Sequence, residues 1–407
     1  MLILDINHPV LKHHRVFDQE LLPGLAYIDL LFQIFHEKGF DFKSIALKNL
    51  SIHKPLIVGK QLSVLLSMQS ETIDDNTFNI RLEGKNVKNG NVGDDTTCYV
   101  TCEMHKVVSV CFDETIDIEQ IKLSASSVLD FESIYEKCRQ YHMVHTGFMK
   151  AEGKVFITDT GILIDIFPGP DGYDDIENIM FHPTLIDASG AASGKMLSSL
   201  VDDPDKLFLP LHFESFTASS LIQKKCLTYI KHSSLKRKNE LLYQSMDFFD
   251  ESGKKIAELK NFVNKLVRNP GQINPEKKQS DCVSTQLPQS IPKKMPVLTK
   301  ADDKQLPEQH SDNTSSHDDL VVSVKFYLCQ LMAEILDVSP HDIQTDIGYY
   351  EMGLDSSGLL NIVQKIEQKL NSTIPPTLLF EYSTIDELAV YLLNEYPNSF
   401  SEIRKLL

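Results

Sequence analysis

The sequence predicts an α+β protein with two antiparallel sheets, each wrapped around a central helix, followed by a C-terminal four-helix bundle. Three observations predict this fold. A strongly apolar helix followed by strand-like stretches occurs twice before residue 268, residues 269–317 contain no aromatic side chain, and helical periodicity dominates residues 318–397. A chain of 407 residues has room for two or three domains at roughly 150 residues each.

The first half of the leading domain, about residues 1–110, is organised around a helix that is apolar on nearly every side. This helix is predicted from Gly24 to about Glu37, and a helix of that composition must be enclosed by other structure. The strand-like stretches that follow are 62–64, 78–82 and 98–101, with an Asn89-Gly90 turn between the last two.

The same order recurs in the second half, about residues 125–268. A helix is predicted from Thr184 to about Leu200. The predicted strands are 207–216, 226–231, 242–249 and 255–267, and an Asp250-Glu251-Ser252-Gly253 turn joins the last two. A curved antiparallel sheet rolled around a helix therefore fits both halves.

Residues 269–317 are predicted to form a flexible linker between two domains. The stretch contains six of the eighteen prolines, and its six lysines balance its six acidic residues. It has too few apolar side chains to offset the entropy lost on folding.

Residues 318–397 are predicted to form a small acidic helical module. Counted to the end of the chain, this part carries five Lys and Arg against fourteen Asp and Glu, which suggests that it meets basic surfaces on partners. Helices are predicted at Leu320–Leu336, at Ser356–Leu370, and from a capped start at Ser383-Thr384 to about Glu395. Together they predict a four-helix bundle.

The composition excludes several functions. A net charge of −17 repels phosphate backbones and anionic lipids, so we expect neither nucleic acid nor a membrane as a partner. No apolar run reaches the ~18 residues that a membrane span needs, and the apolar start Met1–Leu4 is too short for a signal peptide. The seven cysteines have no metal-ligand spacing, which predicts free thiols in a reducing cytoplasm and no metal site.

Gly353-Leu354-Asp355-Ser356-Ser357 opens the second helix of the acidic module. Asp355 is a good N-cap, and the Ser356 hydroxyl lies in the first turn beside that carboxylate. The stretch from about 320 to 397 resembles the acyl and peptidyl carrier proteins, whose signature is Gly-x-Asp-Ser at the start of helix two. The resemblance implies that a phosphopantetheinyl transferase attaches a 4′-phosphopantetheine arm to Ser356, and that the arm holds the substrate as a thioester.

Two candidate catalytic residues lie near the starts of the two predicted central helices. His14 lies nine residues before Pro23-Gly24, which begin the first helix, and Asp187 follows Phe181-His182-Pro183 in the first turn of the second. Packing the two halves together would bring His14 and Asp187 to one cleft. The region from about residue 5 to 268 resembles the dehydratase domains of polyketide synthases, which are double hot-dog folds with the motifs His-x3-Gly-x4-Pro and His-Pro-x3-Asp-x3-Gln/His.

This resemblance implies dehydration of a 3-hydroxyacyl thioester to the 2-enoyl thioester. The elimination needs a base for the α-proton, which a neutral His14 provides, and an acid for the departing hydroxyl. Asp187 provides that acid if burial keeps it protonated. Backbone N–H groups near Pro23-Gly24 would stabilise the enolate-like oxygen.

Three departures from the dehydratase pattern bear on this chemistry. Asp18 stands where the pattern has Gly, within reach of His14, and Ala191 stands where Gln or His orients the acid. The Gly-Tyr-x-Tyr-Gly-Pro motif is missing, and Tyr141 to Phe148 stands in its place without a proline. In that stretch, His145 either lines the cleft as a substitute polar group or lies at the surface.

A dehydratase followed by a carrier is the order expected in modular polyketide synthases, and Ser357 suggests the branch that recruits its acyltransferase separately. Ketosynthase, ketoreductase and acyltransferase signatures are absent from the sequence, so we expect other polypeptides to supply these partners. The altered motifs leave a double-bond shift and an oxygen-ring closure by conjugate addition as alternatives, together with a catalytically silent scaffold. A homodimer also remains open.

Overall fold

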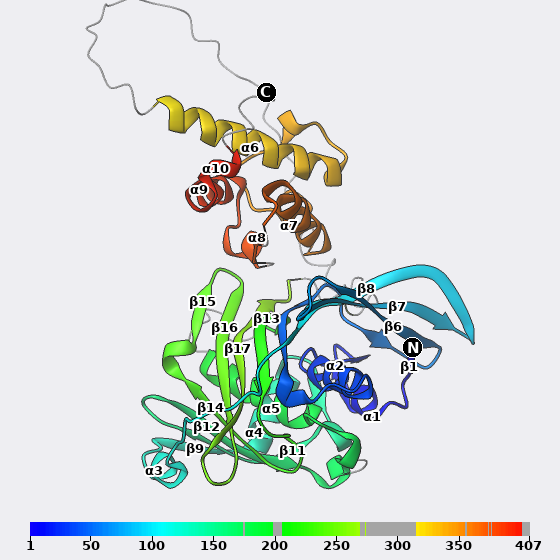
Figure 1. Cartoon of the computed structure of the whole chain (residues 1–407), viewed down its shortest axis with the longest axis vertical. Coiled ribbons are helices and arrows are strands. Elements are labelled where there is room, and N and C mark those ends of the chain that lie inside the picture. The colour runs from blue at the N-terminus through cyan, green and yellow to red at the C-terminus, as the bar shows by residue number, and fades with distance from the viewer. Residues whose placement is uncertain are drawn as a thin grey trace, which may run out of the picture. The chain divides into compact units, whose positions relative to one another are not determined.

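The chain divides into two compact units, Met1–Asn274 and Pro275–Leu407. The computed structural model describes residues 1–173, 176–197, 206–268, 273, 315–354, 356–372, 374–375 and 377–400. In the larger unit a curved sheet surrounds two helices, α2 (Ala26–Glu37) and α5 (Pro183–Leu197) (Figure 1). Within the described part of the chain, no helix is both long and apolar enough to cross a membrane.

Counted over the described residues, the large sheet has 13 strands and runs through both halves of the unit. The antiparallel pair β4 and β13 forms the seam, so the two halves meet edge to edge. Along the sheet the strands are β1 (Leu2–Leu4), β6 (Leu62–Thr72), β7 (Thr77–Lys88), β8 (Asn91–Lys106), β4 (Ile45–Ile52), β13 (Phe208–Ala218), β17 (Lys255–Leu266), β16 (Leu241–Phe249), β14 (Cys226–Lys231), β12 (Gly161–Pro168), β11 (Ala151–Ile157) and β9 (Ser127–Asp130), with β15 (Lys236–Lys238) paired to β16.

A second sheet of four strands also joins the two halves. Its order is β10 (Met143–His145), β2 (His14–Val16), β3 (Gln19–Leu21) and β5 (Ile57–Val58). The β10–β2 pair is antiparallel, and its register sets His145 directly opposite His14. A strand of the second half therefore extends a hairpin of the first.

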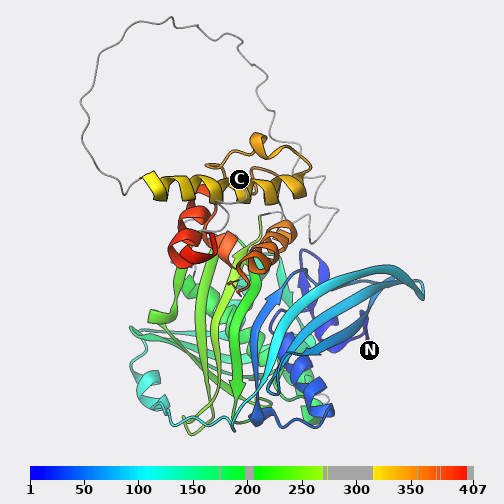
Figure 2. The same ribbon diagram turned by 45° about the horizontal axis from the view of Figure 1, so that its top comes forward.

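The two central helices pack against each other inside the curved sheet, which Figure 2 shows from a second direction. Helix α2 carries bulky side chains on its buried face, and α5 is rich in small residues. Phe32 and Phe35 of α2 are almost completely buried. A Cβ atom added at Gly190 of α5 would lie 3.2 Å from the Leu25 side chain, so this close approach depends on glycine. Just before α5, Phe181 packs edge to face on Phe32 with 4.9 Å between ring centroids.

Asp29 ties the start of α5 to α2. Its Oδ1 accepts hydrogen bonds from the backbone N–H groups of Met180 at 2.9 Å and Phe181 at 2.8 Å, and its Oδ2 accepts one from the Gln33 amide. Burial raises the pKa of Asp29 to about 6, although the bonds from Phe181, Met180 and Gln33 favour the carboxylate.

These elements confirm the predicted fold class, with a central helix in each half. The predicted turn at Asn89-Gly90 joins β7 to β8. The predicted second central helix is observed to Leu197, and residues 198–200 lie outside the described part. The remaining helices of the unit are α1 (Pro9–Lys12), α3 (Ile118–Leu123) and α4 (Phe131–Gln140), with 3-10 turns at Phe42–Ser44, Gly147–Met149, Pro170–Tyr173, Ile176–Asn178 and His232–Ser234.

The smaller unit contains the predicted helical bundle. Its helices are α6 (Ser315–Leu336), α7 (Ser356–Leu370), α8 (Leu378–Glu381), α9 (Ile385–Glu395) and the short α10 (Pro397–Phe400), with a 3-10 turn at Pro340–Asp342. The predicted cap of the last long helix is present, because the Thr384 hydroxyl accepts from the Glu387 N–H at 3.2 Å and the Glu387 carboxylate accepts from the Ser383 N–H at 2.8 Å. Leu328, Ile362 and Leu392 are buried in the bundle core.

Most of the predicted linker, 269–317, lies outside the described residues. Residues 315–317 are described as the start of α6, so that helix begins before the predicted end of the linker. Ile273 is also described, and it is buried against Val16, Phe17 and Leu207. Packing of the larger unit therefore extends past the predicted boundary at residue 268.

Candidate active site

His14 is held in a fixed orientation on β2. The side chain is 2% exposed, and Nδ1 donates a hydrogen bond to the Leu21 carbonyl at 2.7 Å. Because a carbonyl only accepts, the neutral ring carries its proton on Nδ1 and its lone pair on Nε2. Burial, assisted by the neighbouring His145 and opposed by Asp187, lowers the pKa of His14 to about 4. His14 is therefore neutral near pH 7.

Asp187 lies beside His14, as the packing of the two halves predicts. It is the fifth residue of α5, one position beyond the first turn in which the sequence placed it. Its Oδ2 accepts a hydrogen bond from His145 Nε2 at 3.1 Å, and its side chain is 13% exposed. His14, His145 and Asp187 each present a nitrogen or oxygen atom within 4.8 Å of the others. We refer to these three residues as the triad.

The protonation of Asp187 differs from the expectation that burial keeps it protonated. Burial does raise its pKa, but the hydrogen bond from His145 and the electrostatic influence of His14 and His145 outweigh burial. The net result is a pKa below the usual value of a carboxyl group, so the condition set for Asp187 as the acid, that burial keeps it protonated, is not met in the free protein. The donor is His145, one of whose two predicted roles was a substitute polar group lining the cleft, and its hydrogen bond stabilises the charged form.

His145 is buried, which excludes a surface position for it. Its side chain is 1% exposed, and its ring lies against those of His14 at 5.0 Å and Tyr135 at 4.9 Å between centroids. The Tyr135 hydroxyl accepts from the Ala151 N–H at 2.7 Å, which fixes that ring in turn. Within the described residues, His145 Nδ1 has no hydrogen-bond partner.

His182, the histidine of the His-Pro-x3-Asp motif, shapes the start of α5. It is completely buried, donates from Nε2 to the Gly172 carbonyl at 2.7 Å, and accepts at Nδ1 from the Thr184 N–H at 3.2 Å. The Thr184 hydroxyl donates to the Phe148 carbonyl at 2.6 Å. These bonds cap the helix and thereby set the position of Asp187 one turn later.

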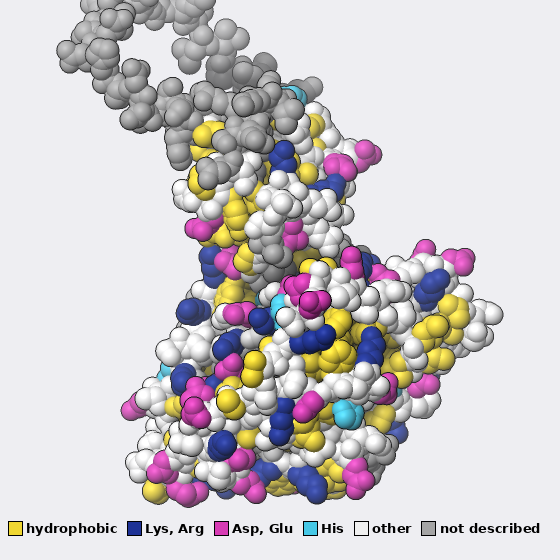
Figure 3. Space-filling view, viewed as in Figure 1, with side chains coloured by type: hydrophobic (Ala, Val, Ile, Leu, Met, Phe, Trp, Pro, Cys, Tyr) yellow, Lys and Arg dark blue, Asp and Glu magenta, His cyan; other side chains and the backbone are white. Residues whose placement is uncertain are grey.

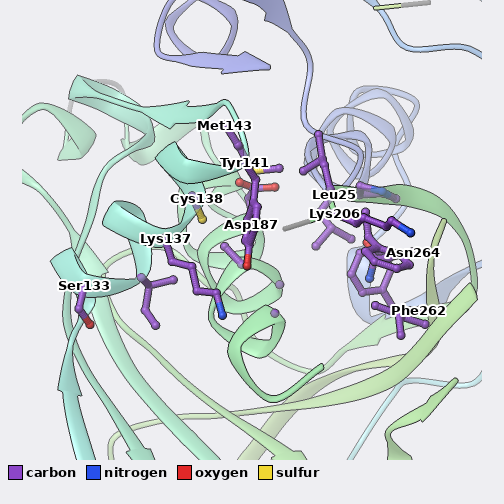
Figure 4. Close-up of a pocket in the computed structure, with 18 of the residues that line it drawn as sticks. Leu25, Ser133, Lys137, Cys138, Tyr141, Met143, Asp187, Lys206, Phe262 and Asn264 are labelled. Atoms are coloured by element: carbon purple, nitrogen blue, oxygen red, sulfur yellow. The ribbon is translucent and has the colours of Figure 1, made fainter. Parts of the chain in front are cut away.

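A cavity of about 250 Å³ opens at Asp187. Figure 4 shows this carboxylate with Lys137 and Cys138 of α4 on one side and Leu25 and Phe262 on the other. Most of the lining is apolar, including Leu25, Ile134, Met143, Leu207, Leu242 and Phe262. Such a pocket accommodates a hydrocarbon chain whose polar carbons lie at the carboxylate.

The substituted positions 18 and 191 have separate explanations. Asp18 is exposed in the turn between β2 and β3 with a φ of 64°, a left-handed conformation that Asp adopts more readily than most residues. Asp18 is not among the side chains that influence His14 electrostatically, which are His145 and Asp187. Ala191 lies one helical turn after Asp187 and lines the same cavity.

Among the described residues, the triad is the cluster of side chains whose spacing would suit a metal ion. Two imidazoles and one carboxylate form a donor set that Zn²⁺ accepts. Sequence spacing could not reveal this set, because the three residues come from β2, β10 and α5.

Ser356 is the first residue of α7. The free N–H groups at the start of a helix favour a phosphate attached there, so this backbone position fits a phosphopantetheine arm. Gly353 has a φ of 98°, a left-handed conformation that favours glycine in the preceding turn. The predicted N-cap, Asp355, and the side chain of Ser356 lie outside the described part of the structure.

Two family models match the chain. A polyketide synthase dehydratase domain matches residues 3–83, which include His14. A phosphopantetheine attachment site matches residues 327–392, which include Ser356.

Two curated relatives align over nearly the whole chain. The polyketide synthases PksL and PksM of Bacillus subtilis (strain 168) are 38% identical over 400 residues and 37% identical over 393 residues, or 98% and 97% of this chain. The chain spans about 8% of the length of each.

Solved structures match the larger part of the chain. A monomeric dehydratase domain from a trans-AT polyketide synthase split module is 41% identical, with 65% of this chain and 97% of that chain covered and a TM-score of 0.64. An N-terminal dehydratase from the difficidin assembly line is 21% identical, with 68% and 96% covered and a TM-score of 0.62, which supports the fold alone.

Proposed function

The chain belongs to the dehydratases of trans-acyltransferase polyketide synthases and carries a phosphopantetheine-bearing carrier domain, and from that premise we propose that it converts a 3-hydroxyacyl thioester to the 2-enoyl thioester. The observation that carries the proposal is the meeting of His14 and Asp187, from different halves of the unit, where Asp187 faces an apolar cavity. Elimination of water needs a base and an acid at adjacent carbons, and these two groups provide both.

His14 acts as the base. Its Nε2 lone pair takes the proton from the α-carbon, and the bond from Nδ1 to the Leu21 carbonyl holds the ring and stabilises the imidazolium that forms. The start of α2 reaches the cavity at Leu25, so N–H groups at this helix start support the charge that develops on the thioester oxygen.

Asp187 acts as the acid through Oδ1, the oxygen that is not bonded to His145. A substrate that covers its remaining 13% exposure raises its pKa and favours the protonated form. The C–O bond then breaks as Oδ1 gives its proton to the hydroxyl, which leaves as water. The proton on His14 returns to Asp187 across a gap of at most 4.8 Å and resets the site.

Ser356 is the attachment site of the arm in this proposal, because it begins α7 inside the matched phosphopantetheine region. The arm holds the acyl group as a thioester. A phosphopantetheinyl transferase would load it, and a ketosynthase, a ketoreductase and an acyltransferase would act before or after the dehydration.

A second chemistry in the same site is favoured by one observation, the lowered pKa of Asp187. A double-bond shift, or a ring closure by attack of a hydroxyl on an enoyl thioester, moves protons without the loss of water. Neither reaction needs Asp187 to be protonated at the outset.

The test is turnover of 3-hydroxyacyl and enoyl thioesters, read by mass and by ultraviolet absorbance. We expect His14→Ala and Asp187→Asn each to lower the dehydration rate by about 10²–10⁴, the usual value of positioned proton transfer. Their combination should cost little more than the worse single variant, because both groups serve one transition state.

His105→Ala is the matched control, since His105 pairs with Glu103 on β8 of the large sheet, whereas the two histidines of the triad lie on the small sheet. It should leave the rate within about twofold of wild type. If Asp187→Asn keeps full activity on an enoyl thioester while no 3-hydroxyacyl thioester is dehydrated, the second chemistry replaces the first. If no substrate responds to either variant, the domain is a silent scaffold.

A further inference from the structure

We propose that His145 is the positioning residue for the catalytic carboxylate, and that it holds Asp187 Oδ2 so that Oδ1 is presented to the substrate. This inference rests on the proposed function. In this proposal, strand β10 of the small sheet supplies the side chain that orients the acid. The dehydratase pattern has this orienting side chain at position 191 of helix α5.

The first support is the rigidity of the donor. His145 Nε2 donates to Asp187 Oδ2 at 3.1 Å, and the backbone of His145 is fixed by the β10–β2 pairing opposite His14. The His14 ring on one side and the Tyr135 ring on another confine the imidazole. The carboxylate is therefore held by a group that has no room to turn away.

The second support is the residue one turn further along α5. Ala191 lines the same cavity as Asp187, and its methyl group can neither donate nor accept a hydrogen bond. Among the described residues, His145 is the side chain that donates to Asp187. The small side chain at 191 leaves open the space where another donor would stand.

The third support is the unpartnered Nδ1 of His145. A charged imidazolium would leave a buried N–H without an acceptor at this atom, whereas the neutral ring leaves only a lone pair without a donor. A ring with its proton on Nε2 and a lone pair on Nδ1 donates to Asp187 and leaves no buried N–H unpaired at Nδ1. His145 therefore acts through the hydrogen bond, and the transferred proton belongs to Asp187.

The decisive variants are His145→Gln, which keeps an N–H donor but cannot be protonated near neutral pH, and His145→Ala, which removes the donor. On 3-hydroxybutyryl thioester we expect His145→Ala to lower kcat by about 10²-fold with little change in KM, because the carboxylate loses its alignment. His145→Gln should stay within about tenfold of wild type, since a hydrogen bond to the charged form is retained.

A second substitution tests whether His145→Ala loses activity because Asp187 is no longer positioned or because the fold is less stable. His145→Ala/Ala191→Gln should regain at least about tenfold of the lost kcat, because a side chain four residues after Asp187 lies on the same helix face. His145→Ala/Gly194→Gln is the matched control. Gly194 lines the same cavity and has open space for a side chain, but it lies about 10 Å along the helix from Asp187 and should not restore activity.

An activity-free measurement separates this inference from the proposed function. In the full chain labelled with [4-¹³C]aspartate, we expect the carboxyl pKa of Asp187 to be higher in His145→Ala than in wild type and to fall again in His145→Gln. A merely structural residue would not produce this pattern.

The outcomes distinguish the two ideas. If wild type and Asp187→Asn are equally inactive on every 3-hydroxyacyl thioester, the proposed function is wrong, and the carboxyl titration still tests the positioning role. If Asp187→Asn is inactive while His145→Ala retains the wild-type rate, the positioning role is overturned. It is also overturned if folded His145→Gln is as inactive as His145→Ala and Ala191→Gln restores nothing.

Discussion

At the scale of single residues, the surroundings of the triad lower the pKa of both its base and its acid. Burial keeps His14 neutral down to about pH 4, and the bond from His145 keeps Asp187 ionised in the free protein. The site is active in dehydration when His14 is neutral and Asp187 is protonated. The base is therefore available over the whole working range, and the acid limits the active fraction.

The pH dependence of dehydration follows from the lowered pKa values of His14 and Asp187. As the pH rises from 5 to 8, His14 stays neutral while the fraction of free enzyme with a protonated Asp187 falls, so kcat/KM for dehydration should decrease, by up to about tenfold per pH unit. A double-bond shift or ring closure should show a flat profile over this range. The measurement is initial rates at each pH, with circular dichroism as the check that the fold persists. A kcat/KM that drops on acidification with a midpoint near the ordinary histidine value contradicts a buried, neutral His14.

At the scale of secondary-structure elements, Asp29 determines how α5 is anchored on α2. Asp29→Ala leaves the buried N–H groups of Met180 and Phe181 without an acceptor, so we expect it to lower the free energy of unfolding by about 2–4 kcal/mol. Asp29→Asn keeps an acceptor at Oδ1, and Gln33 can reverse its amide to meet the new donor. It should therefore cost less than about 1 kcal/mol. Urea unfolding of the full chain at pH 7 measures both.

The pH dependence of unfolding provides the control for Asp29. Its pKa is raised from 3.8 when unfolded to about 6 when folded, so the folded chain binds this proton more tightly. Its contribution to stability is present below about pH 4 and is lost as the pH rises to about 6. Asp29→Asn should lack this part of the wild-type decline. Equal pH dependence in both proteins would contradict the assignment.

The elements that the sequence predicted best were those with local signals. Both central helices, the hairpin turn at Asn89-Gly90 and the cap at Thr384 each depend on neighbouring residues, and the structure confirms them. Helix α4 carries a readable signal that was missed, since Phe131, Ile134, Tyr135 and Cys138 follow helical spacing and are all buried.

The site could be predicted only in part, for a physical reason. His14 and Asp187 stand in recognisable patterns, but the donor to Asp187 comes from β10, a strand of three residues that exists because it pairs with β2. A strand that short has no alternation to detect, and a side-chain hydrogen bond between distant segments leaves no local trace. The pKa of Asp187 was misjudged for the same reason.

At the scale of the whole molecule, charge is divided unequally between the units. Residues 318–407 hold −9 of the total −17. Figure 3 shows Lys and Arg side chains interspersed with Asp and Glu over the visible face of the larger unit, so that face carries no uniform field.

The division into units predicts where the chain is cut and where it is modified. Residues 269–317 hold six prolines and no aromatic side chain, and burial of Ile273 protects the start of this stretch. Brief proteolysis should therefore cut on the C-terminal side of Ile273 and leave two folded fragments.

If the full chain is first treated with coenzyme A and a phosphopantetheinyl transferase, mass spectrometry should find one arm, on the C-terminal fragment alone. Ser356→Ala should abolish the added mass, whereas the adjacent Ser357→Ala should keep it, because the attachment proposed above is to Ser356, the first residue of α7. An arm that persists in Ser356→Ala would contradict the assignment of the attachment site, and a protease-resistant fragment that spans residues 274–317 would contradict the linker.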